Sequence, residues 1–247
     1  MNKLPVFLLL VLLSPLAQAA GGSSGFQLHS SNDVGNIASL QRGARNFVNY
    51  CLGCHSAKFV RYSRVAKDLG IDESDLTEFL MWTAEKPHQT MEVAMPASDA
   101  ARWFGRTPPD LSLIGRSRGV DWLYTYLKAY YVDDDAIFGV NNLHMPGLSM
   151  PNVLWELEGR KEAVFAETVD ELGNKHREFV EFRLIEPGTL SPGEFDLFVT
   201  DLVNFLDYMG EPMQLKRQSL GIRVIAYLLV FFLLALALKK EYWKDVR

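Results

Sequence analysis

Cysteine is scarce in this sequence, because its 247 residues contain only two, Cys51 and Cys54. Two cysteines form at most one disulfide, so a scaffold held together mainly by disulfides is excluded. Histidines with the spacing of a shared metal site are missing as well. We therefore expect four of the five histidines to lie at the surface, namely His29, His88, His144 and His176.

Positive charge is outnumbered by negative charge outside the C-terminal end, and the whole chain has a formal net charge of −5. Residues 221–247 hold five cations and two anions, and Lys3 adds one cation, so residues 20–220 carry a net charge of −9. A domain this acidic is not expected to bind nucleic acid. Its field attracts a basic partner, and that attraction weakens as salt rises.

Long apolar runs are absent from the middle of the chain and occur near its two ends. The first run, residues 4–16, follows Lys3 and is shorter than the about 20 residues that a spanning helix needs. It leads into Ala17-Gln18-Ala19, a small-x-small pattern typical of signal-peptidase cleavage. We interpret residues 1–19 as a secretory signal peptide, with an uncleaved N-terminal anchor as the alternative.

The second run, residues 222–238, carries Arg223 as its one charge and is followed at once by Lys239 and Lys240. This pattern predicts a transmembrane helix over residues 220–240 and a cytoplasmic tail over 241–247, since basic flanks stay on the cytoplasmic side. A buried core helix is the alternative. Residues 20–219 then form one sizeable domain outside the cytoplasm.

The two cysteines stand in the segment Cys51-Leu52-Gly53-Cys54-His55, which is the attachment motif of c-type haem. At this spacing two thiols reach the two vinyl groups of one porphyrin, and the next imidazole binds the iron. We expect one covalent haem c held by Cys51 and Cys54, with His55 as an axial ligand. A thioredoxin-like redox pair is the alternative, but it requires a βαβ context that is not evident here.

Apolar residues three and four apart predict two helices that enclose this haem. One runs from Ile37 to Cys51. The other begins at a capping box formed by Ser191 and Glu194 and ends near Gly210. Residues 163–185 alternate around Leu172-Gly173-Asn174 and predict a small surface hairpin. The expected fold is mostly α: a cytochrome c-type haem domain with a small β-hairpin insertion and one C-terminal transmembrane helix.

An electron-transfer haem requires a sixth ligand, and methionine in that position raises its reduction potential. Four methionines lie neither in a helical apolar pattern, nor in the signal peptide, nor beside the membrane segment: Met91, Met95, Met145 and Met150. Residue types alone leave the choice among them open.

Several blocks in order resemble cytochrome c1, the haem subunit of the cytochrome bc1 complex. Residues 39–43 (SLQRG) precede the haem motif, residues 108–112 (PPDLS) and 116–118 (RSR) follow it, and Leu148-Ser149-Met150-Pro151 comes next. The resemblance covers most of the chain beyond the signal peptide. It implies that Met150 is the sixth ligand, with Met145 as the main rival and Met95 as a weaker one. It also implies that Arg118 points toward a haem propionate and that the PPDLS block borders the haem.

The resemblance further implies a single-pass protein of the bacterial inner membrane, with a periplasmic haem domain, in a dimeric complex with cytochrome b and the Rieske iron–sulfur protein. The domain is then expected to accept one electron from the Rieske protein and to pass it to a soluble or tethered periplasmic cytochrome c. No substrate bond is made or broken at this haem, so quinol oxidation belongs to the assembled complex. The acidic run Asp133-Asp134-Asp135 is either a docking surface for that cytochrome or an ordinary solvated face.

Two other functions stay open. The chain is alternatively a tethered electron carrier for another respiratory oxidase or dehydrogenase, or a haem enzyme or gas sensor in which His55 is the only strong ligand. Rapid binding of carbon monoxide distinguishes the last of these from an electron carrier.

Overall fold

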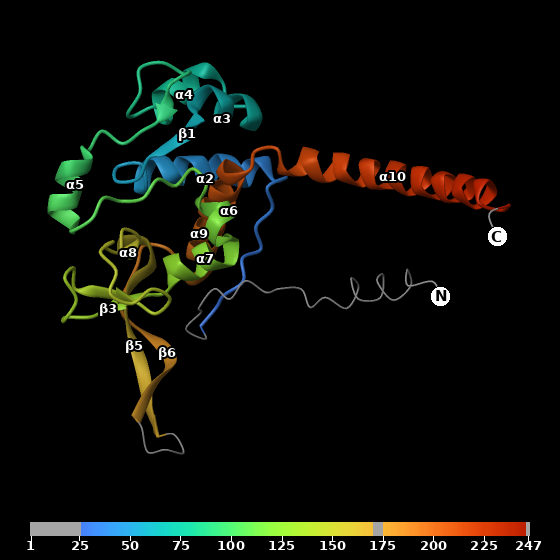
Figure 1. The fold of residues 1–247 in the computed structure, drawn as a ribbon. Coiled ribbons are helices and arrows are strands. Elements are labelled where there is room, and N and C mark those ends of the chain that lie inside the picture. Colours follow the sequence, from blue (N-terminus) through green and yellow to red (C-terminus); the bar gives the residue numbers. More distant parts are fainter. Residues whose placement is uncertain (1–25, 170–174, 246–247) are drawn as a thin grey trace.

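The computed structural model describes residues 26–169 and 175–245 (Figure 1). The predicted signal peptide, 1–19, and the predicted hairpin turn, 172–174, lie outside these residues. The helices are α2 (Ile37–Tyr50), α3 (Tyr62–Leu69), α4 (Glu73–Phe79), α5 (Ala97–Phe104), α6 (Ile114–Arg118), α7 (Val120–Lys128), α8 (Trp155–Glu158), α9 (Pro192–Gly210) and α10 (Gln214–Tyr242). The strands form three antiparallel pairs: β1 (Ala57–Arg61) with β2 (Thr90–Met91), β3 (Tyr130–Val132) with β4 (Val140–Asn142), and β5 (Gly159–Val169) with β6 (Lys175–Pro187).

Helices α2 and α9 cross at the centre of the domain and begin at well-formed caps. The Asn36 side chain accepts a hydrogen bond from the Ser39 amide at the start of α2. Ser191 and Glu194 form the reciprocal capping box of α9, and Pro192 occupies its first turn, where the missing N–H costs nothing. Both helices confirm the prediction from apolar spacing.

Glycine allows α2 and α9 to approach closely. A Cβ at Gly43 on α2 would lie 2.1 Å from the Asp201 carbonyl oxygen on α9. Next to this contact, the Arg42 guanidinium donates two hydrogen bonds, of 2.6 and 2.9 Å, to the buried Asp201 carboxylate. One turn further along α2, Phe47 is fully buried and its ring lies 5.7 Å from that of Phe205. The crossing therefore fixes where the C-terminal end of α2 points.

Two further helices pack on α9 and complete the core. Gly115 on α6 lies against α9 so closely that a Cβ there would be 2.6 Å from the Leu206 carbonyl oxygen. Helix α7 follows directly and packs on α9 through its buried leucines, Leu123 and Leu127. One region of the domain is thus surrounded by four helices: α6, α7, α9 and the C-terminal end of α2.

The hairpin of β5 and β6 is anchored to the domain by buried charges at its base. Lys161 pairs with Glu158 and donates a 2.7 Å hydrogen bond to the Lys128 carbonyl, while the Lys128 ammonium pairs with Asp196 on α9. Burial lowers the pKa of Lys161 and raises that of Glu158, so each group depends on the other for its charge. The hairpin confirms the predicted one but is longer, since its strands extend to Gly159 and Pro187.

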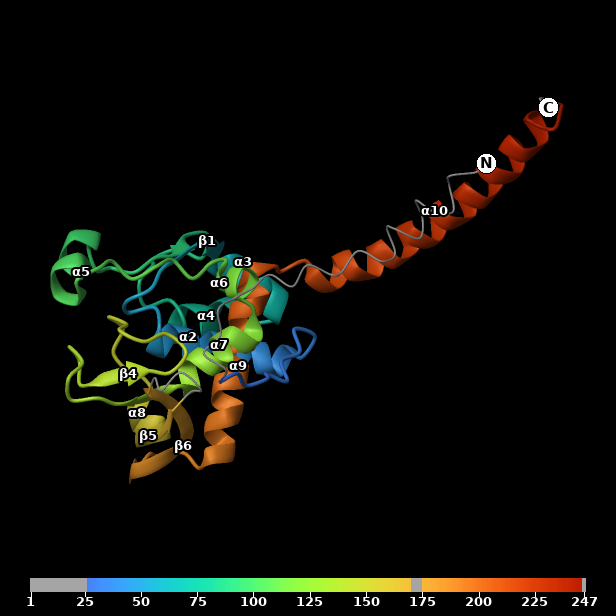
Figure 2. The ribbon, with the colours of Figure 1, turned by 60° about the horizontal axis from the view of Figure 1, so that its bottom comes forward.

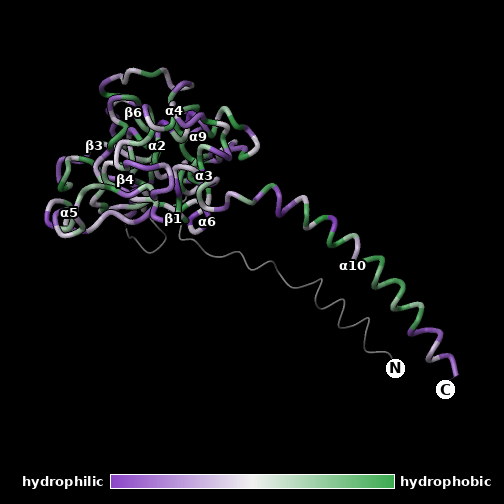
Figure 3. The backbone as a smooth tube through the Cα atoms, turned by 90° about the horizontal axis from the view of Figure 1, so that it is seen from above, coloured by the Kyte–Doolittle hydropathy of each residue, from purple (hydrophilic) through white to green (hydrophobic). Residues whose placement is uncertain are grey.

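Helix α10 projects alone from the domain (Figures 1 and 2). Its 29 residues give a length of about 43 Å. Among the described residues it is the one helix long and apolar enough to cross a membrane, and none of its apolar window is buried. Figure 3 shows that its apolar part is the half farther from the domain, followed by a polar end. The predicted segment 220–240 lies within α10, which starts earlier because the mostly polar residues 214–219 also favour a helix.

The predicted fold class is confirmed as a mostly helical domain with a hairpin and one long C-terminal apolar helix. The pairs β1–β2 and β3–β4 and the short helices α3 to α8 had no sequence prediction. Their strands contain two to five residues, too few for an alternating pattern to stand out. They connect the core helices and shape the loops around the central region.

Replacing Gly43 with alanine tests the close crossing of α2 and α9. The added methyl collides with backbone, which cannot rotate away, so we expect a loss of about 1–3 kcal/mol in the free energy of unfolding. Guanidinium unfolding of the detergent-solubilised protein, followed by far-ultraviolet circular dichroism, measures it. Gly193→Ala on α9 is the matched control, since a Cβ there meets nothing within 4 Å. Equal stability of the two variants would refute this account of the crossing.

Candidate functional site

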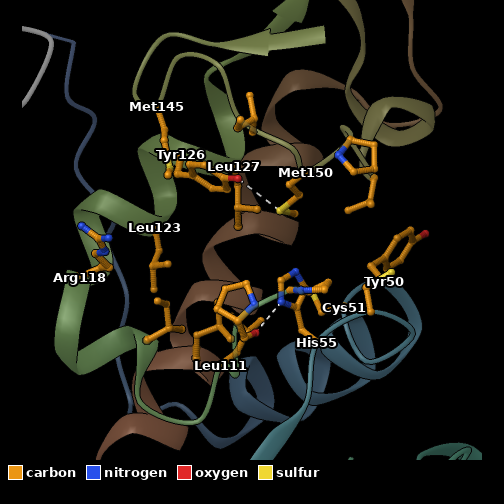
Figure 4. A pocket seen from close by; sticks show the side chains of 18 of the residues that line it. Tyr50, Cys51, His55, Leu111, Arg118, Leu123, Tyr126, Leu127, Met145 and Met150 are labelled. Carbon is orange, nitrogen blue, oxygen red and sulfur yellow. Dashed lines mark hydrogen bonds between the residues drawn. The ribbon is translucent and has the colours of Figure 1, made fainter. Parts of the chain in front are cut away.

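A cleft opens where α2, α6, α7 and α9 meet (Figure 4). It contains about 1290 Å³ of empty space, including its open mouth. Its apolar wall comes from α6, α7, α9 and the segment after Met150: Ile114, Leu123, Leu127, Leu202, Leu206 and Val153. Cys51, Cys54 and His55 line one side of the cleft, and residues 145 and 148–151 line another.

The two cysteines lie in the turn that ends α2. The Cys51 amide donates to the Phe47 carbonyl at 2.9 Å, and the amides of Cys54 and His55 donate to the Cys51 carbonyl at 3.1 and 2.8 Å. This turn brings both thiols and the imidazole to the cleft, as the motif predicts. Both cysteines are free. Burial, with a smaller effect of Cys54, raises the pKa of Cys51 to about 12, and burial also raises that of Cys54. Both thiols are therefore protonated at neutral pH.

The His55 ring is oriented by one hydrogen bond. Its Nδ1 lies 2.8 Å from the carbonyl oxygen of Pro109, and because a carbonyl only accepts, Nδ1 carries the proton. The other ring nitrogen, Nε2, then has a free lone pair, as a metal ligand requires. Burial lowers the pKa of His55, although the Pro109 hydrogen bond and Asp110 oppose this effect. The neutral imidazole is thus the stable form at neutral pH.

The loop that carries Pro109 is fixed by Asp110. Its carboxylate accepts hydrogen bonds of 2.9 Å from the amides of Lys58 and Ser112, and the Leu111 amide donates to the Ser56 carbonyl at 2.8 Å. These bonds join the loop to the chain that follows His55. Pro108 and Pro109 line the cleft, as expected for the PPDLS block.

Met150 faces His55 across the cleft (Figure 4). The Tyr126 hydroxyl donates a hydrogen bond to its sulfur at 3.3 Å. Met145 also lines the cleft but is 37% exposed, whereas Met95 is not among the lining residues and Met91 is buried in the core. The geometry favours Met150 over its rivals, and its role as a ligand stays a prediction.

Arg118 lines the cleft at the end of α6, and its guanidinium lies over the Trp122 ring, 4.9 Å from the centroid. Its predicted contact with a propionate stays a prediction. His144 is buried, so its expected surface position is wrong. Its ring packs edge-on against Trp122 at 5.2 Å, a contact that no spacing in the sequence indicates. His29, His88 and His176 are exposed as expected.

The cleft fits a c-type haem. Two thiols lie at its edge, the wall is apolar, and a neutral imidazole with a free nitrogen faces a thioether sulfur. Haem iron takes nitrogen and sulfur as its axial ligands in electron carriers. Cys51, Cys54, His55 and Met150 are the residues that would hold the group.

Sequence reasoning missed Tyr126 and its neighbours on α7. Trp122 and Tyr126 stand four residues apart and share one face of α7, and Tyr130 follows after four more residues at the start of β3; this spacing was the available signal. The spacing alone is equally typical of core packing. Only the approach of the loop around Met150, 24 residues further along the chain, gives Tyr126 a partner.

A mostly helical domain that brings a Cys-x-x-Cys-His segment and a methionine to one apolar cleft defines the class of c-type cytochromes. Residues 190–246 match the Cytochrome C1 family. Cytochrome c1 of Allochromatium vinosum is 49% identical over 96% of each chain. The ammonia monooxygenase gamma subunit of Nitrosomonas europaea is 41% identical over the whole of both chains, and cytochrome c1 of Rhodospirillum rubrum is 27% identical over 84% of this chain and 82% of its own. The chain belongs to the cytochrome c1 family, which confirms the resemblance found in its sequence.

Replacing Asp110 with asparagine tests whether the Asp110 carboxylate stabilises the loop that carries Pro109. Burial raises the pKa of this carboxyl, but hydrogen bonds from Ser112 and Lys58 outweigh it and lower the pKa overall. A lowered pKa means that the charged form stabilises the fold above the ordinary aspartate value and that this stabilisation is lost as pH falls through the lowered value. We expect Asp110→Asn to unfold at lower urea concentration at neutral pH and to approach the wild type as the pH falls through the lowered pKa of Asp110.

The control for this measurement is Asp99→Asn, which removes an aspartate paired with Arg102 on the surface of α5. It should leave the urea midpoint nearly unchanged, because exposed ion pairs contribute little. A constant difference between Asp110→Asn and the wild type across the whole pH range would contradict a role for the carboxylate charge.

Proposed function

We propose that the chain is the membrane-anchored monohaem cytochrome c1 of a respiratory bc1 complex, which accepts one electron from the Rieske iron–sulfur protein and passes it to a soluble cytochrome c. The observation that carries this proposal is the cleft in which His55, with Nε2 free, faces the Met150 sulfur beside two free cysteines. Membership of the cytochrome c1 family supports it.

When bound, the haem supplies an iron that changes between the ferrous and ferric states and so stores one electron. The residues of the cleft bind, orient and shield it. Cys51 and Cys54 attach the group by thioether bonds, and Pro109 holds the His55 ring in the orientation that presents Nε2. His55 and Met150 would ligate the iron from the two sides of the cleft and would so keep oxygen and other small ligands away from it. Leucines of α7 and α9 would cover one side of the group with apolar side chains.

The anchor and the charge of the chain fit this role. Helix α10 would anchor the domain in the inner membrane, in contact with lipid, with the cleft on the periplasmic side and the basic end of the helix in the cytoplasm. Cytochrome b and the Rieske protein would be its partners in the complex. The acidic domain would draw in a basic cytochrome c at low salt. The predicted dimer belongs to the same proposal.

A second candidate function is suggested by the relative named as an ammonia monooxygenase gamma subunit. In that case the same haem domain would serve as the tethered electron carrier of another oxidase. Purification of the native assembly separates the two: a dihaem b-type subunit and an iron–sulfur protein that co-purify with the chain support the bc1 complex. If neither protein co-purifies and an oxygenase subunit does, the result would favour the second candidate.

Replacing Met150 with leucine tests the axial ligand. Leucine keeps the apolar volume but has no lone pair, so we expect the oxidised protein to lose the weak near-infrared Met-to-iron band. The reduced protein should bind carbon monoxide and its midpoint potential should fall sharply, since the sixth position opens. Optical spectra and a redox titration of the purified protein measure all three.

The matched control is Met145→Leu, a methionine that also lines the cleft but is more exposed. It should keep the band and reject carbon monoxide. If Met145→Leu loses the band and Met150→Leu keeps it, the ligand is Met145 and the assignment of Met150 is wrong. Rapid carbon monoxide binding by the unaltered protein would instead indicate a haem enzyme or gas sensor.

A further inference from the structure

An aromatic column follows one face of α7 and continues into β3. The rings of Trp122 and Tyr126 are stacked, with centroids 5.1 Å apart and planes 9° from parallel. Tyr130 meets Tyr126 edge-on at 5.6 Å and is almost fully buried. Arg118 covers the outer face of Trp122. The orientation of the Tyr126 ring is therefore fixed by packing against the neighbouring rings.

The hydroxyls of this column form a directed chain of hydrogen bonds that ends at Met150. The Tyr130 hydroxyl donates to the Tyr126 hydroxyl at 3.0 Å, and the Tyr126 hydroxyl donates to the Met150 sulfur at 3.3 Å. A thioether sulfur has no proton to give, so Tyr126 is the donor in that contact. Tyr130 also lies 3.4 Å from the Met150 carbonyl oxygen, which is a longer and weaker alternative for its proton.

The backbone around both partners is held as well. The fully buried Asn142 donates from Nδ2 to the Tyr126 carbonyl at 2.8 Å, and its Oδ1 accepts the amides of His144 and Met145 at 2.9 and 3.1 Å. One side chain thus joins the end of α7 to the start of the loop that leads to Met150. The backbone contacts of Asn142 on both segments therefore restrain the distance between the Tyr126 hydroxyl and the Met150 sulfur.

We propose that Tyr126 is a positioning residue for the Met150 thioether, and that its hydrogen bond to the sulfur raises the reduction potential of the haem. This inference rests on the proposed role of Met150 as a ligand. A thioether sulfur has two lone pairs, so it accepts a hydrogen bond with one while it binds a metal with the other. A donor on the second pair draws electron density from the sulfur, which then stabilises the electron-poor ferric state less than the ferrous state.

The variant Tyr126→Phe removes the hydroxyl and keeps the stacked ring. We expect it to retain the Met-to-iron band, shifted to lower energy because the sulfur lone pair is no longer stabilised. At a fixed solution potential the ratio of reduced to oxidised protein should fall by about threefold, the order expected for the loss of one hydrogen bond. Tyr130→Phe should change the ratio in the same direction by less, because it removes only the polarising donor to Tyr126. A spectroelectrochemical titration measures the ratio and the band together.

The matched control is Tyr124→Phe. Tyr124 is a buried tyrosine of α7 whose hydroxyl accepts from Lys128 and which does not line the cleft, so its loss should leave the potential unchanged. Where Tyr126→Phe fails to fold, as judged by circular dichroism, Tyr130→Phe decides the question by the sign of its shift.

The outcomes separate this inference from the proposal it rests on. A Tyr126→Phe potential equal to that of the wild type and of the control, with the band present in all three, would overturn the role of Tyr126 and leave Met150 as the ligand. If the wild type itself lacks the band, the assignment of Met150 fails first. Loss of the band in Tyr126→Phe alone would support the positioning role directly, since the sulfur then leaves the iron.

Discussion

The close approach of α2 to α9 at Gly43 is the contact on which the rest of the domain depends. With no side chain at Gly43, the two backbones touch, and the ion pair of Arg42 with Asp201 and the tilted ring contact of Phe47 with Phe205 fix the angle of the crossing. The C-terminal end of α2 then has one position relative to α9. Because the cysteines and His55 lie in the turn that ends α2, their place in the cleft follows from this crossing.

The two sides of the cleft come from separate parts of the chain that α9 brings together. The Cys-x-x-Cys-His turn follows α2, whereas the loop around Met150 follows α7 and β4. Helix α9 comes after both in sequence and packs against α2, α6 and α7. Gly115 allows α6 to lie against α9 as Gly43 does for α2. The cleft therefore forms only when α9 has docked, and its leucines become the back wall.

The sequence predicted those features whose pattern is local. The spacing of the haem motif, the capping box of Ser191 and Glu194, and the apolar run of α10 each depend on residues within one element, and all three segments are where the sequence placed them. Features that depend on contacts across the chain were not predictable. His144 is buried because Trp122 packs on it, and the role of Tyr126 appears only when the loop around Met150 reaches it. A family resemblance selected Met150, since residue types alone did not.

His55 and Met150, the two residues that we propose as ligands of the haem iron, take part in hydrogen bonds of opposite character. On one side the Pro109 carbonyl accepts the Nδ1 proton of His55, which would make the imidazole a stronger electron donor to a bound iron and would favour the ferric state. On the other side the Tyr126 hydroxyl donates to the Met150 sulfur, which would make the thioether a weaker electron donor to the iron and would favour the ferrous state. Each bond is fixed by its own supports, Asp110 below His55 and Asn142 beside Tyr126. With these two residues as ligands, the balance of two contacts made by different loops would set the reduction potential, so a change in either loop would shift the potential without replacing a ligand.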